Sequence, residues 1–123
     1  MYKVLLVDDE YMITEGLKRL IPFEQWDMEV VATANHADDA LDYVREHPVD
    51  IVISDVNMPD KTGLEMIHEM KDLLPNAYYI MLSGYQEFDY VKKAMNLSVV
   101  DYLVKPVDKV ELGNLLEKIA SQL

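Results

Sequence analysis

Short runs of apolar, β-branched residues alternate along this chain with longer stretches in which apolar residues recur at a helical period. The expected strands are residues 3–7, 29–34, 50–54, 78–83 and 101–104. Several of them are apolar at consecutive positions, which is typical of strands buried on both faces of a parallel sheet. This alternation restricts the chain to an α/β fold, a doubly wound parallel sheet with right-handed crossovers and helices on both faces.

Five helices are expected between and after these strands. The apolar stripes that predict them begin at Ile13, Ala37, Leu64, Phe88 and Leu112. Pro22 and Pro75 end the first and the third helix, and Asn35 is expected to cap the second. Asp108, followed three residues later by Glu111, is expected to open the fifth helix as a capping box.

Length and composition exclude several classes of function. The 123 residues have the size of one domain with a single core. Eleven basic and 23 acidic residues give a formal net charge of -12, so the surface repels nucleic acid and anionic membranes. The absence of cysteine excludes disulfides and thiolate metal sites and fits a reducing compartment. The longest apolar run, residues 77–82, is far shorter than the roughly 18 residues of a membrane span. We therefore expect a cytoplasmic domain that binds neither nucleic acid nor membrane.

Polar side chains follow the expected strands at the point where each strand ends. Asp8 and Asp9 follow the first strand, Asp55 follows the third, Ser83 closes the fourth, and Lys105 follows the fifth. In doubly wound folds, ligands bind beyond the carboxyl ends of the strands, where the strand order changes direction. If the first, third, fourth and fifth strands are neighbours, these side chains converge on one crevice.

The side chains gathered there suit phosphoryl transfer. Carboxylates a few ångströms apart raise each other's pKa and destabilise a fold unless a cation lies among them. Mg²⁺ satisfies this need with one or two carboxylates and leaves coordination positions for phosphate oxygens. Asp55 would act as a nucleophile toward phosphorus, with Lys105 neutralising charge and the Ser83 hydroxyl donating a hydrogen bond.

Each of these features has a simpler explanation when it is taken alone. The acids of VDDE, residues 7–10, are typical of a helix N-terminus, and Glu10 needs no other role. A single aspartate such as Asp55 is often a turn former, and a lysine before proline, such as Lys105, is usually solvated. These explanations do not predict that every group lies at the same end of its own strand, and the joint pattern therefore favours the phosphoryl-transfer site.

Four motifs occur in order along the chain: LLVDDE (5–10), DIVISDVNMPDKTGLE (50–65), YIMLSGY (79–85) and DYLVKPV (101–107). Through them, essentially the whole chain resembles the receiver domain of bacterial two-component response regulators. Finer features, among them residues 21–34, are similar to receivers whose output domain is an AraC-type helix-turn-helix DNA binder. The resemblance implies a flavodoxin-like sheet with strand order 2-1-3-4-5.

The resemblance implies specific roles at the acidic site. Asp55 would be the phospho-acceptor, and Mg²⁺ would be the cofactor. Asp9 would bind the metal directly, Asp8 mainly through metal-bound water, and Asn57 through its backbone carbonyl. The domain would assist its own phosphorylation and dephosphorylation and would not be an enzyme acting on a separate substrate.

The resemblance also implies how the signal enters and leaves. A sensor histidine kinase would donate the phosphoryl group, and Lys105, before a cis-proline bond to Pro106, would pair with it. Ser83 would be the switch hydroxyl and Tyr102 the switch aromatic, coupling the site to the face formed by the fourth helix, fifth strand and fifth helix. That face would contact the output domain or form a homodimer.

Residues 1–123 are thus expected to form a receiver domain whose DNA-binding output domain is absent from this chain, through truncation or because the receiver stands alone. Lys61 departs from the family, many of whose members have an apolar residue at this position. An aspartate-nucleophile phosphatase of the haloacid dehalogenase kind is the alternative, but it needs a second acid where this chain has Asn57. The four glycines form neither a P-loop nor a dinucleotide fingerprint.

Overall fold

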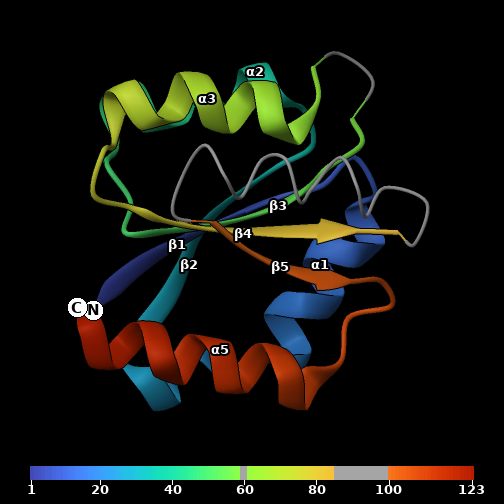
Figure 1. Cartoon of the computed structure of the whole chain (residues 1–123), viewed down its shortest axis with the longest axis vertical. Coiled ribbons are helices and arrows are strands. Elements are labelled where there is room, and N and C mark those ends of the chain that lie inside the picture. The colour runs from blue at the N-terminus through green and yellow to red at the C-terminus, as the bar shows by residue number, and fades with distance from the viewer. Residues whose placement is uncertain (59–60, 85–99) are drawn as a thin grey trace.

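The computed structural model describes residues 1–58, 61–84 and 100–123 and contains one five-stranded sheet (Figure 1). Its strands are β1 (Tyr2–Val7), β2 (Met28–Ala34), β3 (Ile51–Asp55), β4 (Tyr78–Ser83) and β5 (Val100–Val104). All neighbouring pairs are parallel, in the order β2-β1-β3-β4-β5. The expected parallel sheet and its order 2-1-3-4-5 are confirmed.

Helices cover both faces of this sheet. They are α1 (Tyr11–Leu20), α2 (Ala37–Glu46), α3 (Gly63–Leu73) and α5 (Lys109–Gln122), with the short 3-10 helix η1 (Phe23–Trp26). Figure 1 shows α2 and α3 on one face of the sheet and α1 and α5 on the other. The helix expected from Phe88 onward lies outside the described residues. Across the part of the chain that the structure describes, no helix has the length and apolar character needed to cross a membrane.

The core lies on both faces of the sheet because successive residues of a strand point in opposite directions. The cluster on the α2–α3 face includes Leu5, Val7, Leu41, Val52, Met66 and Tyr79. The cluster on the α1–α5 face includes Val4, Leu6, Leu17, Ile53, Leu116 and Ile119. Since β1 and β3 contribute to both clusters, their consecutive apolar residues are explained by burial on both sides. Polar groups are placed where these strands end.

The cap predicted for α2 is wrong. His36, and not Asn35, is the N-cap of α2, and it makes no side-chain capping hydrogen bond. His36 has extended backbone angles, so the helix begins one residue later than a cap at Asn35 would place it. Asp38 and Asp39 lie in the first turn instead, where negative charge interacts favourably with the helix N-terminus.

The starts of α3 and α5 carry side-chain caps. The Asp108 carboxylate caps α5, accepting from the N–H groups of Val110 at 2.8 Å and Glu111 at 3.2 Å, which is the N-cap half of the capping box expected there. At α3, Thr62 and Glu65 form a reciprocal capping box that the sequence analysis did not single out. The Glu65 N–H donates to Thr62 Oγ1 at 3.2 Å, which fixes the start of the helix that follows β3.

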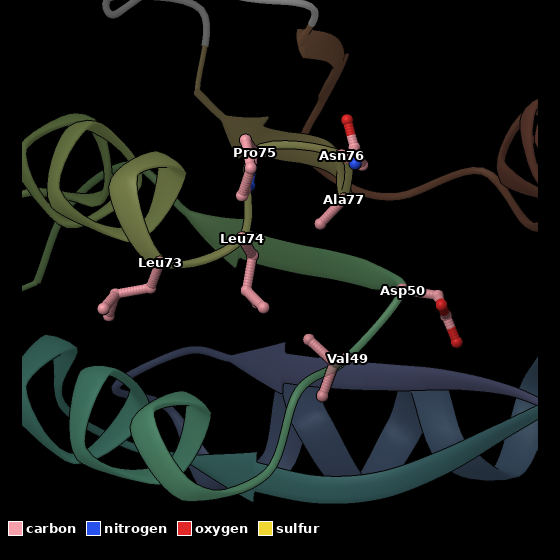
Figure 2. A pocket seen from close by; sticks show the side chains of 7 residues that line it. All are labelled: Val49, Asp50, Leu73, Leu74, Pro75, Asn76 and Ala77. Carbon is pink, nitrogen blue, oxygen red and sulfur yellow. The ribbon is translucent and has the colours of Figure 1, made fainter.

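A small pocket of about 200 Å³ lies at the amino ends of β3 and β4 (Figure 2). It is lined by Val49, Asp50 and residues 73–77, and Figure 2 shows the Asp50 side chain directed away from the apolar residues. The Asp50 carboxylate accepts a hydrogen bond from the Lys3 N–H at 2.8 Å, so its role is to join strands. The pocket lies at the opposite end of the sheet from the predicted site.

Candidate functional site

The structure brings the predicted acids and the predicted lysine together at the carboxyl edge of the sheet. Asp8 follows β1, Asp55 ends β3, and Lys105 follows β5. The Lys105 Nζ lies 3.1 Å from Asp55 Oδ1 and 3.4 Å from Asp8 Oδ2. Asp8 and Asp55 are only 1% and 5% exposed, so both carboxyl groups are held in a buried hollow.

Burial and pairing act in opposite directions on the ionisation of this site. Burial raises the pKa of Asp8 to about 6, although the Glu10 N–H and Lys105 favour its charged form. Burial also raises the pKa of Asp55 against the effect of Lys105. For Lys105, burial lowers the pKa, but the charges of Asp55 and Asp8 outweigh it and the net direction is upward. One ammonium is therefore insufficient for the two carboxylates, and the site favours a further positive charge.

Two exposed acids extend the cluster toward solvent. Carboxylate oxygens of Asp8, Asp9 and Glu10 lie within 4.8 Å of one another. The charge of Asp9 contributes to the raised pKa of Asp55, and Asp9 therefore belongs to the same electrostatic site. Glu10 is the N-cap residue of α1, as the sequence predicted, and its N–H donates to Asp8 Oδ1 at 2.9 Å. Its carboxylate is a member of the acidic cluster that sequence reasoning missed, although the run of three acids was the available signal.

Ser83 provides a buried hydroxyl at the same edge of the sheet. It follows Leu82, which pairs with Asp55, and its residue is 1% exposed. Among the described residues, Ser83 Oγ is the buried side-chain polar atom without a hydrogen-bond partner. Leaving a buried hydroxyl unsatisfied typically destabilises a protein by about 1–3 kcal/mol. An oxygen-rich group bound at this site would satisfy it.

The loop after β3 fixes the backbone around Asp55. The Gly63 N–H donates to the Val56 carbonyl at 2.7 Å, and the Asn57 N–H hydrogen-bonds to the Asp55 carboxylate. A Cβ on Gly63 would lie 2.2 Å from the Asp55 carbonyl oxygen, closer than any side-chain carbon can approach. Gly63 therefore constrains the backbone of the site, a role that sequence reasoning missed. The only feature of the sequence that pointed to it was its place directly after a threonine that caps a helix.

On the fifth strand, Tyr102 lies where it can be coupled to Ser83. Tyr102 pairs with Met81 and Val104 pairs with Ser83 across β4 and β5, so Ser83 and Tyr102 point to the same face of the sheet. Tyr102 is half-buried against the α2–α3 cluster. The Lys105 N–H donates to the Ser83 carbonyl at 2.7 Å, and the Lys105–Pro106 peptide bond is cis, as predicted.

An apolar groove of about 510 Å³ adjoins the site and lies on the α1–α5 face of the sheet. It is lined by Met12, Ile13, Gly16, Leu17 and Leu20 of α1 and by residues 105–107. Met12 is 78% exposed and Leu20 is 62% exposed, so part of the apolar stripe of α1 lies outside the core. The groove therefore presents apolar side chains to solvent directly beside Lys105.

Comparison with known proteins shows a consistent set of relatives. The family described as the response regulator receiver domain matches residues 4–117. The chain is 39% identical over 123 residues to an uncharacterised response regulatory protein of Staphylococcus epidermidis, and 37% identical to the transcriptional regulatory protein HptR of Staphylococcus aureus. Each alignment covers 100% of this chain and 48% of the relative, so the chain spans about half the length of these curated relatives.

Solved structures give the same result. The REC domain of AraT, a response regulator from Geobacillus stearothermophilus, is 38% identical with a TM-score of 0.92, covering 98% of this chain and 94% of that chain. A two-component transcriptional regulator AraC from Clostridium phytofermentans is 28% identical with a TM-score of 0.91, covering 99% of this chain and 94% of that chain.

Proposed function

Because this chain belongs to the response regulator receiver domain family, we propose that it is a signalling switch in which Asp55 accepts a phosphoryl group. The observation that carries the proposal is the convergence of Asp8, Asp55 and Lys105 in one buried hollow. The unpartnered hydroxyl of Ser83 at the same edge supports it, because a phosphoryl oxygen is the partner that this donor lacks.

In this mechanism, the side chains of the domain position and neutralise the transferred group. An Asp55 oxygen attacks phosphorus, and its new bond forms as the bond from phosphorus to a histidine nitrogen of the donor breaks, leaving the electron pair on that nitrogen. The Asn57 N–H holds the Asp55 carboxylate, and Lys105 lies close enough to pair with the phosphoryl oxygens after transfer. The reaction depends mainly on positioning, so small phosphodonors are also substrates.

The donor set fits Mg²⁺, since it consists of hard oxygen atoms around a site with surplus negative charge. Asp8, Asp9, Asp55 and the backbone carbonyl of Asn57 are the groups that would hold it. When bound, the metal would supply positive charge that offsets the charge of the phosphoryl oxygens. The raised pKa values of Asp8 and Asp55 support this assignment, because a cation restores their ionised forms.

The phosphorylated state is read out through Ser83 and Tyr102. The phosphoryl oxygens attract the Ser83 hydroxyl, and Tyr102, on the neighbouring strand and the same sheet face, moves toward the vacated space. The result is a population shift between two arrangements of β5, α5 and the expected fourth helix, which lies outside the described residues. In the cytoplasm, the face formed by the expected fourth helix, β5 and α5 would control an AraC-type DNA-binding domain outside residues 1–123, or would form a homodimer.

The partner that delivers the phosphoryl group is a sensor histidine kinase, and the groove beside Lys105 is its docking site. Lys105 both lines this groove and contacts Asp55, so a partner bound in the groove lies beside the acceptor. Gly16 has negative φ, and a Cβ built on it meets no atom within 4 Å, so neither the backbone nor packing within the domain requires glycine there. A glycine in the interior of a helix is unfavourable by roughly 1 kcal/mol relative to alanine, and the close approach of a partner helix explains its presence.

Mass spectrometry after treatment with acetyl phosphate and Mg²⁺ tests the acceptor assignment. We expect one phosphate adduct on the wild-type protein and none on Asp55→Asn. Asp39→Asn is the matched control, because it removes an exposed carboxylate from the first turn of α2 and should leave the adduct unchanged. An adduct of wild-type yield on Asp55→Asn would overturn the proposal.

A further inference from the structure

We propose that Lys61 is a positioning residue, which ties the loop between β3 and α3 to two helices and thereby holds the backbone of Asp55 and Asn57. The ammonium Nζ lies 3.5 Å from Asp38 Oδ1 in the first turn of α2 and donates a hydrogen bond to Glu69 on α3. The Lys61 side chain is 24% exposed, although it belongs to a loop. A single cation thus joins three separate segments. The inference rests on the proposed function only in the part that concerns Mg²⁺ binding.

Isolated surface ion pairs contribute little to stability, but this arrangement differs from an isolated pair. Two carboxylates from different helices share one ammonium, and the hydrogen bond to Glu69 raises the pKa of Lys61, which keeps it charged. Both carboxylates contact this ammonium, so its removal leaves two like charges near each other without the cation that they share. The removal of Lys61 therefore takes away the attraction that joins the three segments.

The described residues 61–63 connect Lys61 to the phospho-acceptor through contacts of Thr62 and Gly63. The Gly63 N–H donates to the Val56 carbonyl at 2.7 Å, and the Thr62 capping box begins directly after Lys61. The Cα of Gly63 packs against the Asp55 carbonyl so closely that there is no space for a Cβ. Because there is no free space between Gly63 and Asp55, a displacement of Lys61 that moves Gly63 also moves the Asp55 backbone.

Hydrogen exchange of the Gly63 amide in metal-free protein tests this inference directly, because that amide closes the loop. We expect Lys61→Met to accelerate its exchange by roughly threefold to tenfold, the effect of losing a small ion-pair network. Lys61→Arg should restore the slow exchange, and about 1 M salt should reduce the difference between wild type and Lys61→Met through screening. Lys118→Met, which removes an exposed lysine from α5, is the matched control and should exchange like wild type.

Unchanged Gly63 exchange in Lys61→Met would overturn the inference, and so would acceleration that neither arginine nor salt alters. Calorimetric titration with Mg²⁺ is the second readout, and we expect several-fold weaker binding by Lys61→Met with recovery in Lys61→Arg. If wild type itself takes up no Mg²⁺, the metal assignment fails, but the exchange result still decides the role of Lys61. Equal Mg²⁺ affinity of wild type and Lys61→Met would overturn the part of the inference that concerns the metal.

Discussion

At the scale of single residues, the site is a compromise between the burial of two acids and their pairing with one lysine. Lys105 contacts both Asp8 and Asp55, yet burial still raises the pKa of both carboxyl groups. A charged group in a nearly solvent-free hollow loses more hydration than one shared ammonium replaces. The metal-free protein should therefore be less stable with these acids ionised than with one of them protonated.

This imbalance predicts how stability depends on pH. The pKa of Asp8 rises from 3.8 to about 6 on folding, so the folded state binds this proton more tightly than the unfolded state. The stabilisation is complete below about pH 4 and is lost as the pH rises through about 6, with a limit of roughly 3 kcal/mol. Urea unfolding of the metal-free protein at pH 5 and pH 7.5 should show a larger loss of unfolding free energy for wild type than for Asp8→Asn.

Asp8→Asn is informative because the titrating groups that do not interact with Asp8 are common to both proteins and cancel in the comparison. Adding Mg²⁺ at pH 7.5 should recover stability in wild type and less in Asp8→Asn, because the metal binds the folded state. Identical pH dependence of the two proteins would show that the burial of Asp8 does not control its ionisation.

At the scale of elements, strand ends and helix starts place the functional groups. The sequence was sufficient to place Asp8, Asp55, Ser83 and Lys105 at one edge, since strands that alternate with helices form a parallel sheet. It did not predict that Lys61 joins α2 and α3, because apolar periodicity identifies the buried face of a helix and not the residues that two helices bring together. The same reason explains why Gly63 was missed: its constraint is a tertiary contact with the Asp55 carbonyl.

The start of α3 gives the prediction at this scale, which compares two glycines in different surroundings. Gly63→Ala places a Cβ 2.2 Å from the Asp55 carbonyl oxygen, so the backbone of the acceptor must move. We expect it to lower the unfolding free energy by roughly 1–3 kcal/mol and to slow labelling by acetyl phosphate. Gly16→Ala, whose Cβ meets no atom within 4 Å, should instead stabilise α1 by roughly 0.5–1 kcal/mol and leave this labelling unchanged.

Urea unfolding and a labelling time course separate these effects. Wild-type stability together with wild-type labelling in Gly63→Ala would contradict the close contact between Gly63 and Asp55. Destabilisation by Gly16→Ala would show that the α1 glycine is required inside the domain, and this would remove one argument for a partner helix at the groove.

At the scale of the whole molecule, the proposed docking groove and the proposed switch aromatic lie on opposite faces of the sheet. The groove between α1 and residues 105–107 lies on the α1–α5 face, whereas Tyr102 packs into the cluster on the α2–α3 face. Lys105 lines the groove and contacts Asp55, and its N–H is bonded to the Ser83 carbonyl. The acceptor is thus reached from one face, while the proposed switch residues respond on the other.

This separation predicts that docking of a large phosphodonor can be impaired without harm to the chemistry. Met12→Glu places a charge in the apolar groove at a side chain that is 78% exposed, so the fold should tolerate it. We expect transfer from a phosphorylated histidine kinase active on wild type to fall about tenfold or more, because a buried, unpaired charge opposes docking. Labelling by acetyl phosphate should be unchanged, since a small donor needs no groove.

Val110→Glu is the matched control, because Val110 is 70% exposed on α5 and does not line the groove. Its transfer rate from the kinase should equal that of wild type. Equal loss in both variants would indicate a general effect of added negative charge on a chain that already carries a net charge of -12. Wild-type transfer by Met12→Glu would place the kinase elsewhere, whereas parallel losses with kinase and acetyl phosphate would mean that the substitution disturbs Lys105, the residue that the groove shares with the acceptor site.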